Sequence, residues 1–303
     1  MAEHTRVDEF LTSLIAICKP LDSFEMPLLD AHGATLSQDV FAGERLVMKA
    51  GSRIRSTQIG LAASIGLDHL PTRPHPRVVV MSAGPDLVEP GKTLKDDEEF
   101  ETNSWMLTTA VREVGAVAYR VHSIPDDEAQ LQNLIEDQLV RADLIIISGE
   151  RHDDSFDLIT RTISNMGEIT TVDMAIEMSG RHNFGLIGPD KTPIITLPGD
   201  PIAAYISFEL FVRPMIRTML GAATIHRPSV KAKLEKAIES SEGMRSYIRA
   251  ALSEDGKSVT PLTNQEEIST LSDASAFIAV GEKDVSLKAG DEVTVVILER
   301  RYI

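Results

Sequence analysis

The sequence predicts an α/β protein that has a helical N-terminal segment and a small C-terminal β domain. Near the N-terminus, apolar residues recur at helical spacing, as seen for Val7, Phe10, Leu11, Leu14 and Ile15. From residue 77 to residue 222, short apolar strands alternate with amphipathic helices, which is typical of a parallel sheet covered by helices. Past residue 227, short alternating strands and turns favour a β domain.

We place the domains at residues 1–72, 73–222 and 223–303. The first domain is expected to be helical, with a second helix over residues 56–65. The proline-rich run from Pro71 to Pro76 disfavours helix and marks the first boundary. The second boundary follows a long apolar helix that we expect to end near Gly221.

The predicted elements of the central domain alternate in chain order. Strands are expected over residues 78–81, 116–121 and 144–147, and helices over residues 104–114, 126–140 and 156–166. Asp126 is the expected N-cap of its helix. Strands near residues 170–178, 184–187 and 193–197 then lead to a Pro-Gly-Asp-Pro turn. There Asp200 is expected to cap a helix that has Pro201 in its first turn.

The composition limits the classes of partner. The chain has 46 Asp and Glu residues against 30 Lys and Arg residues, a formal net charge of −16, so nucleic acid and anionic membrane surfaces are not expected partners. Cys18 is expected to be buried, and one cysteine cannot form a disulfide framework. No apolar run approaches the ~20 residues of a membrane span, and the N-terminus lacks a signal-peptide pattern. We therefore expect a cytoplasmic protein without membrane insertion.

An acidic loop follows the most apolar predicted strand. Ser148 and Gly149 form a small-residue turn at its carboxyl end, where open α/β sheets bind phosphate-like groups. The next residues carry an excess of carboxylates, which disfavours an anion. Oxygen ligands of this kind could hold a divalent cation, although a solvated loop is the favoured interpretation. The candidate metal ligands are Glu150, His152, Asp153, Asp154 and Asp157.

The order of short motifs along the chain resembles the molybdopterin molybdenumtransferase family, the group of MoeA and the gephyrin E-domain. The motifs are Pro27–Gly33, Lys49–Ile54, Ser82–Gly91, Thr102–Ser104, Pro125–Asp127, Ile147–Gly149, Leu197–Pro201 and Phe208–Pro214. The resemblance implies a central α/β domain of molybdopterin-binding type, a C-terminal β domain, a helical N-terminal region and an elongated homodimer. It also implies that the family's second domain is absent here, because only the residues between Val40 and Ala50 bridge that interval.

The resemblance assigns candidate site residues to this chain. The positions that match ligand contacts of the family are treated as vestigial: Gly84, Asn103, Ser148, Gly149, Pro198, Gly199 and Pro201. Asp86, Asp126 and Asp157 are residual candidates for a catalytic carboxylate. Each has a structural alternative. The Pro-Gly-Asp-Pro segment can serve as a turn and cap, and Asp126 and Asp157 can complement a helix N-terminus.

Two positions reverse the charge of the family's pattern. The lysines that face the anionic ligand align with Asp173 and Glu177, and a glycine of the Ser-Gly-Gly loop is replaced by Glu150. Each reversal replaces an attraction by a repulsion, on the order of 4 kcal/mol for unit charges about 4 Å apart at an effective dielectric of ~20. The sequence therefore predicts a retained fold with a degenerate ligand site.

Two functions follow from the resemblance. The first is a non-catalytic dimeric scaffold without a cofactor. It would bind a partner peptide, such as one from the cell-division protein FtsZ, between the N-terminal helix and the β domain. Its expected contacts are Asp8, Leu11 and Phe277, although residues 276–280 can also form an inner strand. The alternative is a molybdopterin molybdenumtransferase that uses adenylated molybdopterin, molybdate and Mg²⁺. An unassigned small-ligand site in the same crevice stays open as a third interpretation.

Overall fold

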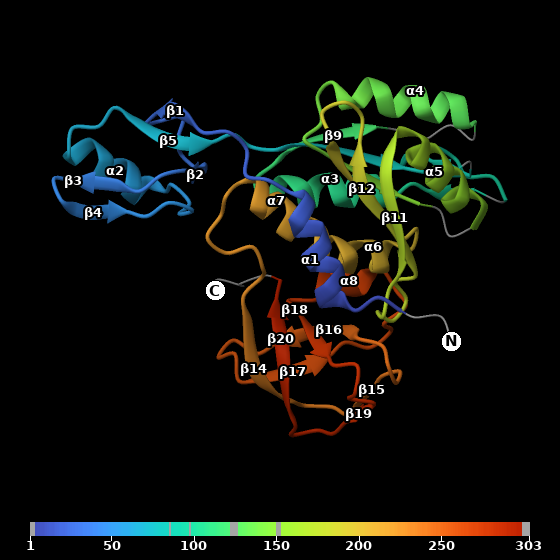
Figure 1. Cartoon of the computed structure of the whole chain (residues 1–303). Coiled ribbons are helices and arrows are strands. Elements are labelled where there is room, and N and C mark those ends of the chain that lie inside the picture. Colours follow the sequence, from blue (N-terminus) through green and yellow to red (C-terminus); the bar gives the residue numbers. More distant parts are fainter. Residues whose placement is uncertain (1–3, 85, 97, 122–126, 150–152, 299–303) are drawn as a thin grey trace.

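The computed structural model describes residues 4–84, 86–96, 98–121, 127–149 and 153–298. Figure 1 shows a central α/β domain, a C-terminal barrel beneath it and a small N-terminal lobe that stands to one side. Within the described ranges, no helix is long and apolar enough to cross a membrane.

A six-stranded sheet of order β11-β12-β13-β10-β6-β9 forms the centre of the molecule. Four strands are parallel, and β12 runs antiparallel to β11 and β13. Alternate residues of β6 and β10 enter two different cores, as Val78 and Val79 do, so these strands are buried on both faces. The bounds are β6 Arg77–Ser82, β9 Val117–Val121, β10 Leu144–Ser148, β11 Gly167–Asp173, β12 Arg181–Ile187 and β13 Thr192–Leu197.

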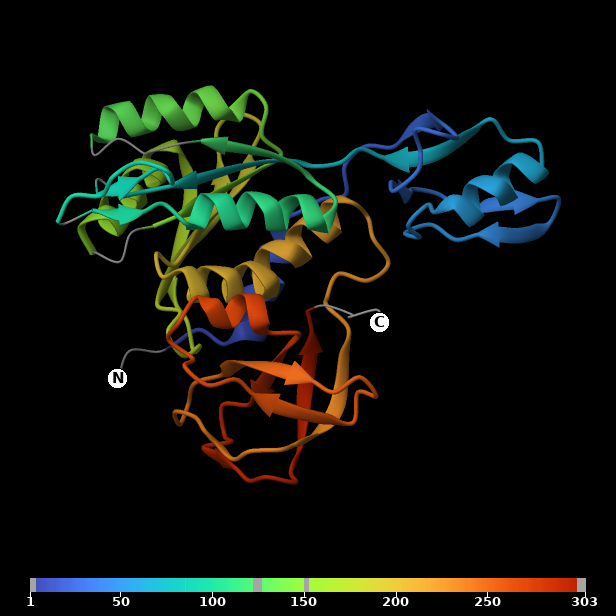
Figure 2. The same cartoon turned by 180° about the vertical axis from the view of Figure 1, so that it is seen from behind.

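Different helices cover the two faces of the sheet. One face carries α4 (Glu128–Leu139) and α5 (Asp153–Met166). The other carries α3 (Asn103–Val114) and a continuous rod made of α6 (Pro201–Ser207), the π-helical η1 (Phe208–Val212) and α7 (Arg213–Met219). This rod lies between the sheet and the barrel (Figure 2). The short strands β7 (Leu87–Val88) and β8 (Glu99–Phe100) pair beyond the end of β6.

Two predicted helix caps can be compared with the structure. Asp200 caps α6 by accepting hydrogen bonds from the backbone N–H groups of Ile202 (3.0 Å) and Ala203 (2.9 Å), which confirms the prediction. The cap of α4 is Asp127, which accepts from Gln130 N at 2.9 Å. Asp126, the predicted cap, lies outside the described residues and precedes the true cap by one position.

The N-terminal helix α1 (Val7–Ile17) is part of the central domain. Phe10 is 1% exposed and packs edge-on against Phe184 and Phe211, with ring centroids 5.2 and 4.7 Å apart. Cys18 follows the helix and is buried, as predicted, and burial raises the pKa of its thiol to about 12. The structure thus differs from the predicted helical domain over residues 1–72, because its first helix completes the core of the next domain.

The rest of that region forms a separate mixed lobe. It contains the sheet β1-β5-β2, the β3–β4 hairpin and α2 around a core that includes Leu36, Ile54 and Leu70. A two-residue turn joins β3 to β4 where the resemblance places an additional domain. The bounds are β1 Phe24–Pro27, β2 Thr35–Leu36, β3 Val40–Ala42, β4 Arg45–Met48, α2 Ser56–Ser64 and β5 His69–Arg73.

The C-terminal strands close a barrel of order β14-β17-β16-β18-β20, which confirms the predicted β domain. Ile278 and Val295 fill its interior, whereas Tyr247 and Phe277 point outward and join the core of the central domain. The bounds are β14 Ser229–Leu234, β16 Ser246–Leu252, β17 Ser258–Pro261, β18 Ala276–Val280 and β20 Glu292–Ile297. The small elements are β15 Ile238–Glu239, β19 Ser286–Leu287 and α8 Ser269–Asp273.

A buried histidine makes the fold sensitive to acid. His182 is fully buried beside Phe10, its Nδ1 donates to Thr196 O (2.8 Å), and its Nε2 accepts from Ser179 Oγ (2.9 Å). Burial lowers the pKa of His182 from 6.5 to about 4. Between these values the unfolded chain takes up a proton that the folded chain does not, so stability falls as the pH decreases.

We expect this residue alone to remove about 2 kcal/mol from the free energy of unfolding between pH 7 and pH 5. Urea unfolding at the two pH values measures the loss. In a His182→Gln variant the difference between the two pH values should shrink by that amount. An unchanged difference would show that His182 is not the residue responsible.

Candidate functional site

A hydrogen-bonded cluster holds the carboxyl ends of β10 and β13 together. Asn103 Nδ2, on the first residue of α3, donates to Ser148 Oγ (2.8 Å) and to Gly199 O (2.7 Å). Ser148 Oγ in turn donates to Pro198 O (3.1 Å), and Gly149 N donates to Leu197 O (3.0 Å). The structure therefore brings most of the predicted vestigial positions to one edge of the sheet.

The hydrogen bonds of this cluster are made within the protein. The amide nitrogen of Asn103 and the hydroxyl of Ser148 bind the chain itself and fix the shape of this sheet edge, whereas Oδ1 of Asn103 is buried and has no hydrogen-bond partner among the described residues. Gly84 follows the end of β6 by two residues, and Pro201 is the first residue of α6. A Cβ on Gly149 would lie 3.8 Å from Leu197 O, an ordinary contact, so an alanine would fit at this buried turn.

A pocket of about 450 Å³ lies between the central domain and the barrel, next to the Pro198–Pro201 turn. Apolar side chains of α6, namely Ile202, Ala203 and Ile206, form its wall on the central domain. The barrel contributes residues of β16 and of the segment that follows β17, including Tyr247, Arg249 and Leu262. Concave, mostly apolar pockets with a few polar groups are typical of small-molecule sites.

Arg249 is the polar group that distinguishes this pocket. It is 3% exposed, and its Nε donates to Thr270 Oγ1 (3.0 Å). Its Nη2 is buried and has no hydrogen-bond partner within the described ranges. Burial lowers the pKa of Arg249, while the charges of Asp200 and Glu266 raise it. An unmet buried donor costs about 1–3 kcal/mol.

Sequence reasoning did not identify Arg249. The sequence contained only a weak sign of its role. Arg249 lies on the same face of an amphipathic strand as Tyr247, at a position where an apolar residue would be expected to pack. Its significance arises from the pairing of β16 with β18, which turns this face towards the central domain.

The two charge-reversed positions lie in different environments. Glu177 lines the pocket, but its Oε1 accepts from Ser241 Oγ (2.8 Å) and its Oε2 from Ser246 Oγ (2.5 Å). Its carboxylate is thereby tied to the barrel. Asp173, at the end of β11, has His4 Nδ1 within 3.6 Å of its Oδ2. Each carboxylate thus has a partner inside the chain, a feature that the sequence did not reveal.

The predicted catalytic carboxylates do not form a group among the described residues. Asp157 lies in the second turn of α5 because this helix begins at Asp153 and not at Phe156, so the predicted role at the helix N-terminus is wrong. Its carboxylate instead lies 3.6 Å from Arg181, whose guanidinium stacks on Phe156. Asp86 is exposed on the loop after β6. Asp126 is outside the described residues.

The predicted metal site lies largely outside the described part of the chain. Glu150, His152 and the side chains of Asp153 and Asp154 lie outside the described part of the structure. Elsewhere in the described ranges, no group of three or more His, Cys, Asp or Glu residues could hold a metal ion.

The predicted partner-binding residues are engaged within the chain. Arg245 forms a bidentate pair with Asp8 (3.1 and 3.2 Å), and its hydrogen bond lowers the pKa of Asp8. Leu11 is half-buried against the central core. Phe277 is fully buried near Tyr205. The prediction that Phe277 forms a groove wall is therefore wrong, and residues 276–280 form the inner strand β18.

Comparison with known proteins identifies both large domains. The model of a probable molybdopterin binding domain matches residues 80–218, and that of the MoeA C-terminal region matches residues 231–298. Two Mycobacterium tuberculosis proteins named molybdopterin molybdenumtransferase 1 and 2 are 30% and 32% identical over 88% and 87% of this chain. The chain spans 65% and 66% of the lengths of these relatives.

A solved structure supports the same assignment of the fold. The MoeA protein of Pyrococcus horikoshii superimposes with a TM-score of 0.83 at 19% identity, covering 98% of this chain and all of that one. Its sequence identity is low, so this match concerns the fold alone. The matched domains and the mycobacterial relatives together show that the chain belongs to the MoeA family, as a member shorter than those relatives.

Proposed function

We propose that this protein binds an adenylated molybdopterin in the interdomain pocket and acts as a molybdopterin molybdenumtransferase, with molybdate as its second substrate. The observation that carries the proposal is Arg249, a buried arginine that lines a pocket beside the Pro198–Pro201 turn and whose Nη2 has no hydrogen-bond partner among the described residues. The names of the mycobacterial relatives supply the reaction class.

The chemistry of the pocket suits a ligand with an anionic group on a flat organic body. Ile202, Ile206 and Leu262 offer apolar surface to a ring, and Arg249 places a positive charge at the pocket wall that favours a phosphate. Of the three carboxylates that line the pocket, Glu239 and Glu266 are exposed and screened by water and Glu177 is half-buried, whereas Arg249 is buried. The buried cation therefore acts on the ligand more strongly than the exposed carboxylates do.

This proposal replaces the predicted scaffold as the leading function. The scaffold depended on an accessible Phe277, which is buried. The predicted homodimer and cytoplasmic location remain parts of the proposal that light scattering and cell fractionation can test.

A transfer assay tests the function itself. Purified protein, molybdate and adenylated molybdopterin are incubated, and the product is detected by reconstitution of a molybdenum-free enzyme. We expect molybdate-dependent reconstitution above the uncatalysed background. Tight binding of the pterin without any transfer would instead indicate that the site recognises the ligand but lacks catalysis.

Replacing Arg249 by methionine separates binding from folding. We expect the affinity for adenylated molybdopterin to fall by about 10- to 100-fold, because a hydrogen bond from a charged donor contributes about 1.5–3 kcal/mol. The free energy of unfolding should change little, because the substitution removes the hydrogen bond from Nε to Thr270 together with an Nη2 that has no partner among the described residues. Fluorescence titration and urea unfolding measure the two quantities.

Lys236→Met is the matched control, since Lys236 lines the same pocket but is exposed. It should weaken binding by much less than Arg249→Met does. Equal losses for the two variants would contradict the special role of the buried guanidinium.

A further inference from the structure

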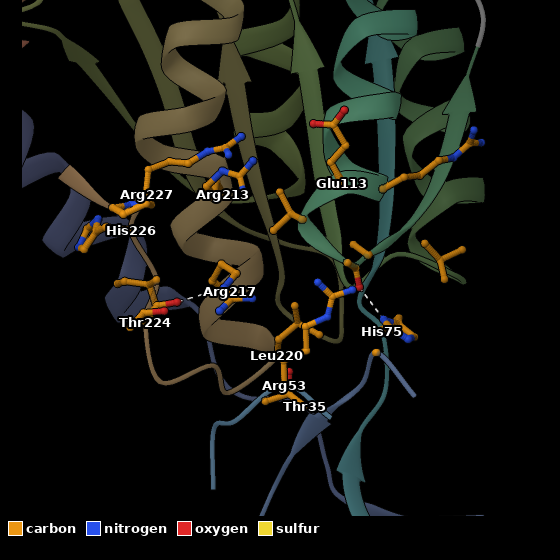
Figure 3. Close-up of a pocket in the computed structure, with 18 residues that line it drawn as sticks. Thr35, Arg53, His75, Glu113, Arg213, Arg217, Leu220, Thr224, His226 and Arg227 are labelled. Carbon is orange, nitrogen blue, oxygen red and sulfur yellow. Dashed lines mark hydrogen bonds between the residues drawn. The ribbon is translucent and has the colours of Figure 1, made fainter. Parts of the chain in front are cut away.

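A second pocket, of about 590 Å³, lies between the N-terminal lobe and the rest of the chain (Figure 3). We call it the arginine pocket because Arg53, Arg112, Arg213, Arg217 and Arg227 all line it. Arg53 reaches in from the lobe, whereas Arg213 and Arg217 belong to α7. Convergence of five arginines is unexpected in a chain of net charge −16.

The carboxylates around the arginine pocket do not balance these charges. Arg213 and Arg227 share one carboxylate, that of Glu209, through contacts of 2.5–3.0 Å. Within the described ranges, no carboxylate forms an ion pair with Arg53, Arg112 or Arg217. Glu113 is the acidic residue among the lining side chains. Five arginines against Glu113 and Glu209 leave a formal charge of about +3.

The neighbouring arginines make the charged form of Arg217 less favourable. Its Nε donates to Thr224 O (3.0 Å), which fixes the side chain at the pocket wall. Burial lowers the pKa of Arg217, and the charges of Arg213 and Arg53 lower it further. Like charges held together in a partly buried site destabilise the free protein and favour the binding of an anion.

We propose that the arginine pocket binds a small phosphate-bearing anion with at least two negative charges. Guanidinium groups donate paired N–H groups that match the oxygens of a phosphate, and several of them around one pocket suit a multivalent anion. The lining contains no Phe, Tyr or Trp side chain on which a nucleobase could stack. The phosphates, and not an attached base, are therefore the recognised group.

The ligand would join the lobe to the rest of the molecule. The lobe approaches the segment after α7 closely, since Ala223 N donates to Gly51 O (3.0 Å), and a Cβ on Gly51 would lie 2.9 Å from Ala223 N. An anion between Arg53 and Arg217 would add a second connection across the same boundary. Binding should thus slow hydrogen exchange at residues 51–54 and 222–226.

Pyrophosphate is the probe, and calorimetric titration of the full chain is the test. We expect saturable binding of pyrophosphate that weakens as salt is added, with weaker binding of orthophosphate. Arg53→Met and Arg217→Met should each reduce the affinity at least tenfold without unfolding the protein, since both relieve repulsion. The control is Arg45→Met, which removes an exposed arginine of the β3–β4 hairpin and should leave the affinity unchanged.

Three results would overturn the proposal. The wild-type protein could fail to bind pyrophosphate, or all three variants could bind it equally well. Alternatively, Arg53→Met and Arg217→Met could change the oligomeric state in light scattering while pyrophosphate does not bind, which would identify the pocket as an interface with a second copy. Arg249→Met tests whether pyrophosphate binds in the interdomain pocket instead. If this variant loses pyrophosphate binding, the anion occupies the interdomain pocket and not the arginine pocket.

Discussion

Replacing Glu209 by alanine is expected to lower the free energy of unfolding by about 3–5 kcal/mol, the usual cost of removing one partner from a buried ion pair. Glu209 lies in the π-helical turn η1 and is 5% exposed. Burial alone would raise its pKa, but hydrogen bonds from Arg227 and Arg213 outweigh burial and lower it. Urea unfolding at neutral pH measures the effect.

The size of the effect follows from what Glu209 connects. Arg213 begins α7, and Arg227 also donates from Nη1 to Leu298 O (2.5 Å) beside the last strand of the barrel. Alanine would leave two arginines without their shared carboxylate and would loosen the barrel from the helical rod. Glu113→Ala is the control, because that carboxylate is exposed. A loss below about 1 kcal/mol in Glu209→Ala would contradict this account.

Replacing Phe10 by alanine is expected to cost about 3–5 kcal/mol, because it leaves a cavity in the core shared by α1 and the central domain. The ring of Phe10 contacts Phe184, Phe211 and His182. Neighbouring ring centroids within this group of four residues are 4.7–5.9 Å apart. Thermal or urea unfolding followed by circular dichroism measures the loss. The result tests whether the N-terminal helix is an integral part of the central domain.

Glu9→Ala on the same helix is the matched control, since Glu9 is exposed and its substitution should change stability by less than about 0.5 kcal/mol. Similar, small effects for both variants would mean that α1 is only loosely attached. A loss for Phe10→Ala that is confined to the helix, with the sheet unaffected, would lead to the same conclusion.

The sequence was sufficient to predict the elements whose stability comes from local patterns. The apolar runs of β6 and β10 and the alternation of strands and helices predicted the central sheet, because strands buried on both faces read as continuous apolar segments. Asp200 and Pro201 predicted the start of α6 because a cap and a first-turn proline act within a few residues. The C-terminal β domain followed from short strands separated by turns, whereas its closure into a barrel was not predicted.

The features that the sequence did not predict depend on contacts between distant segments. The position of α1 depends on its packing against Phe184 and Phe211, which helical spacing alone does not specify. The hydrogen bonds that hold Glu177 come from the barrel, more than sixty residues away in sequence. Arg249 and the arginine pocket likewise arise where domains meet, so a pattern within one segment could not identify them.

The most direct test of the proposed function is an equilibrium titration of adenylated molybdopterin into the wild-type protein at neutral pH and physiological salt. If the interdomain pocket with Arg249 is the substrate site, binding should be saturable, with one ligand per chain and a dissociation constant in the micromolar range or below. The absence of binding at ligand concentrations up to about 1 mM, which corresponds to an affinity weaker than about 4 kcal/mol, would contradict the proposal.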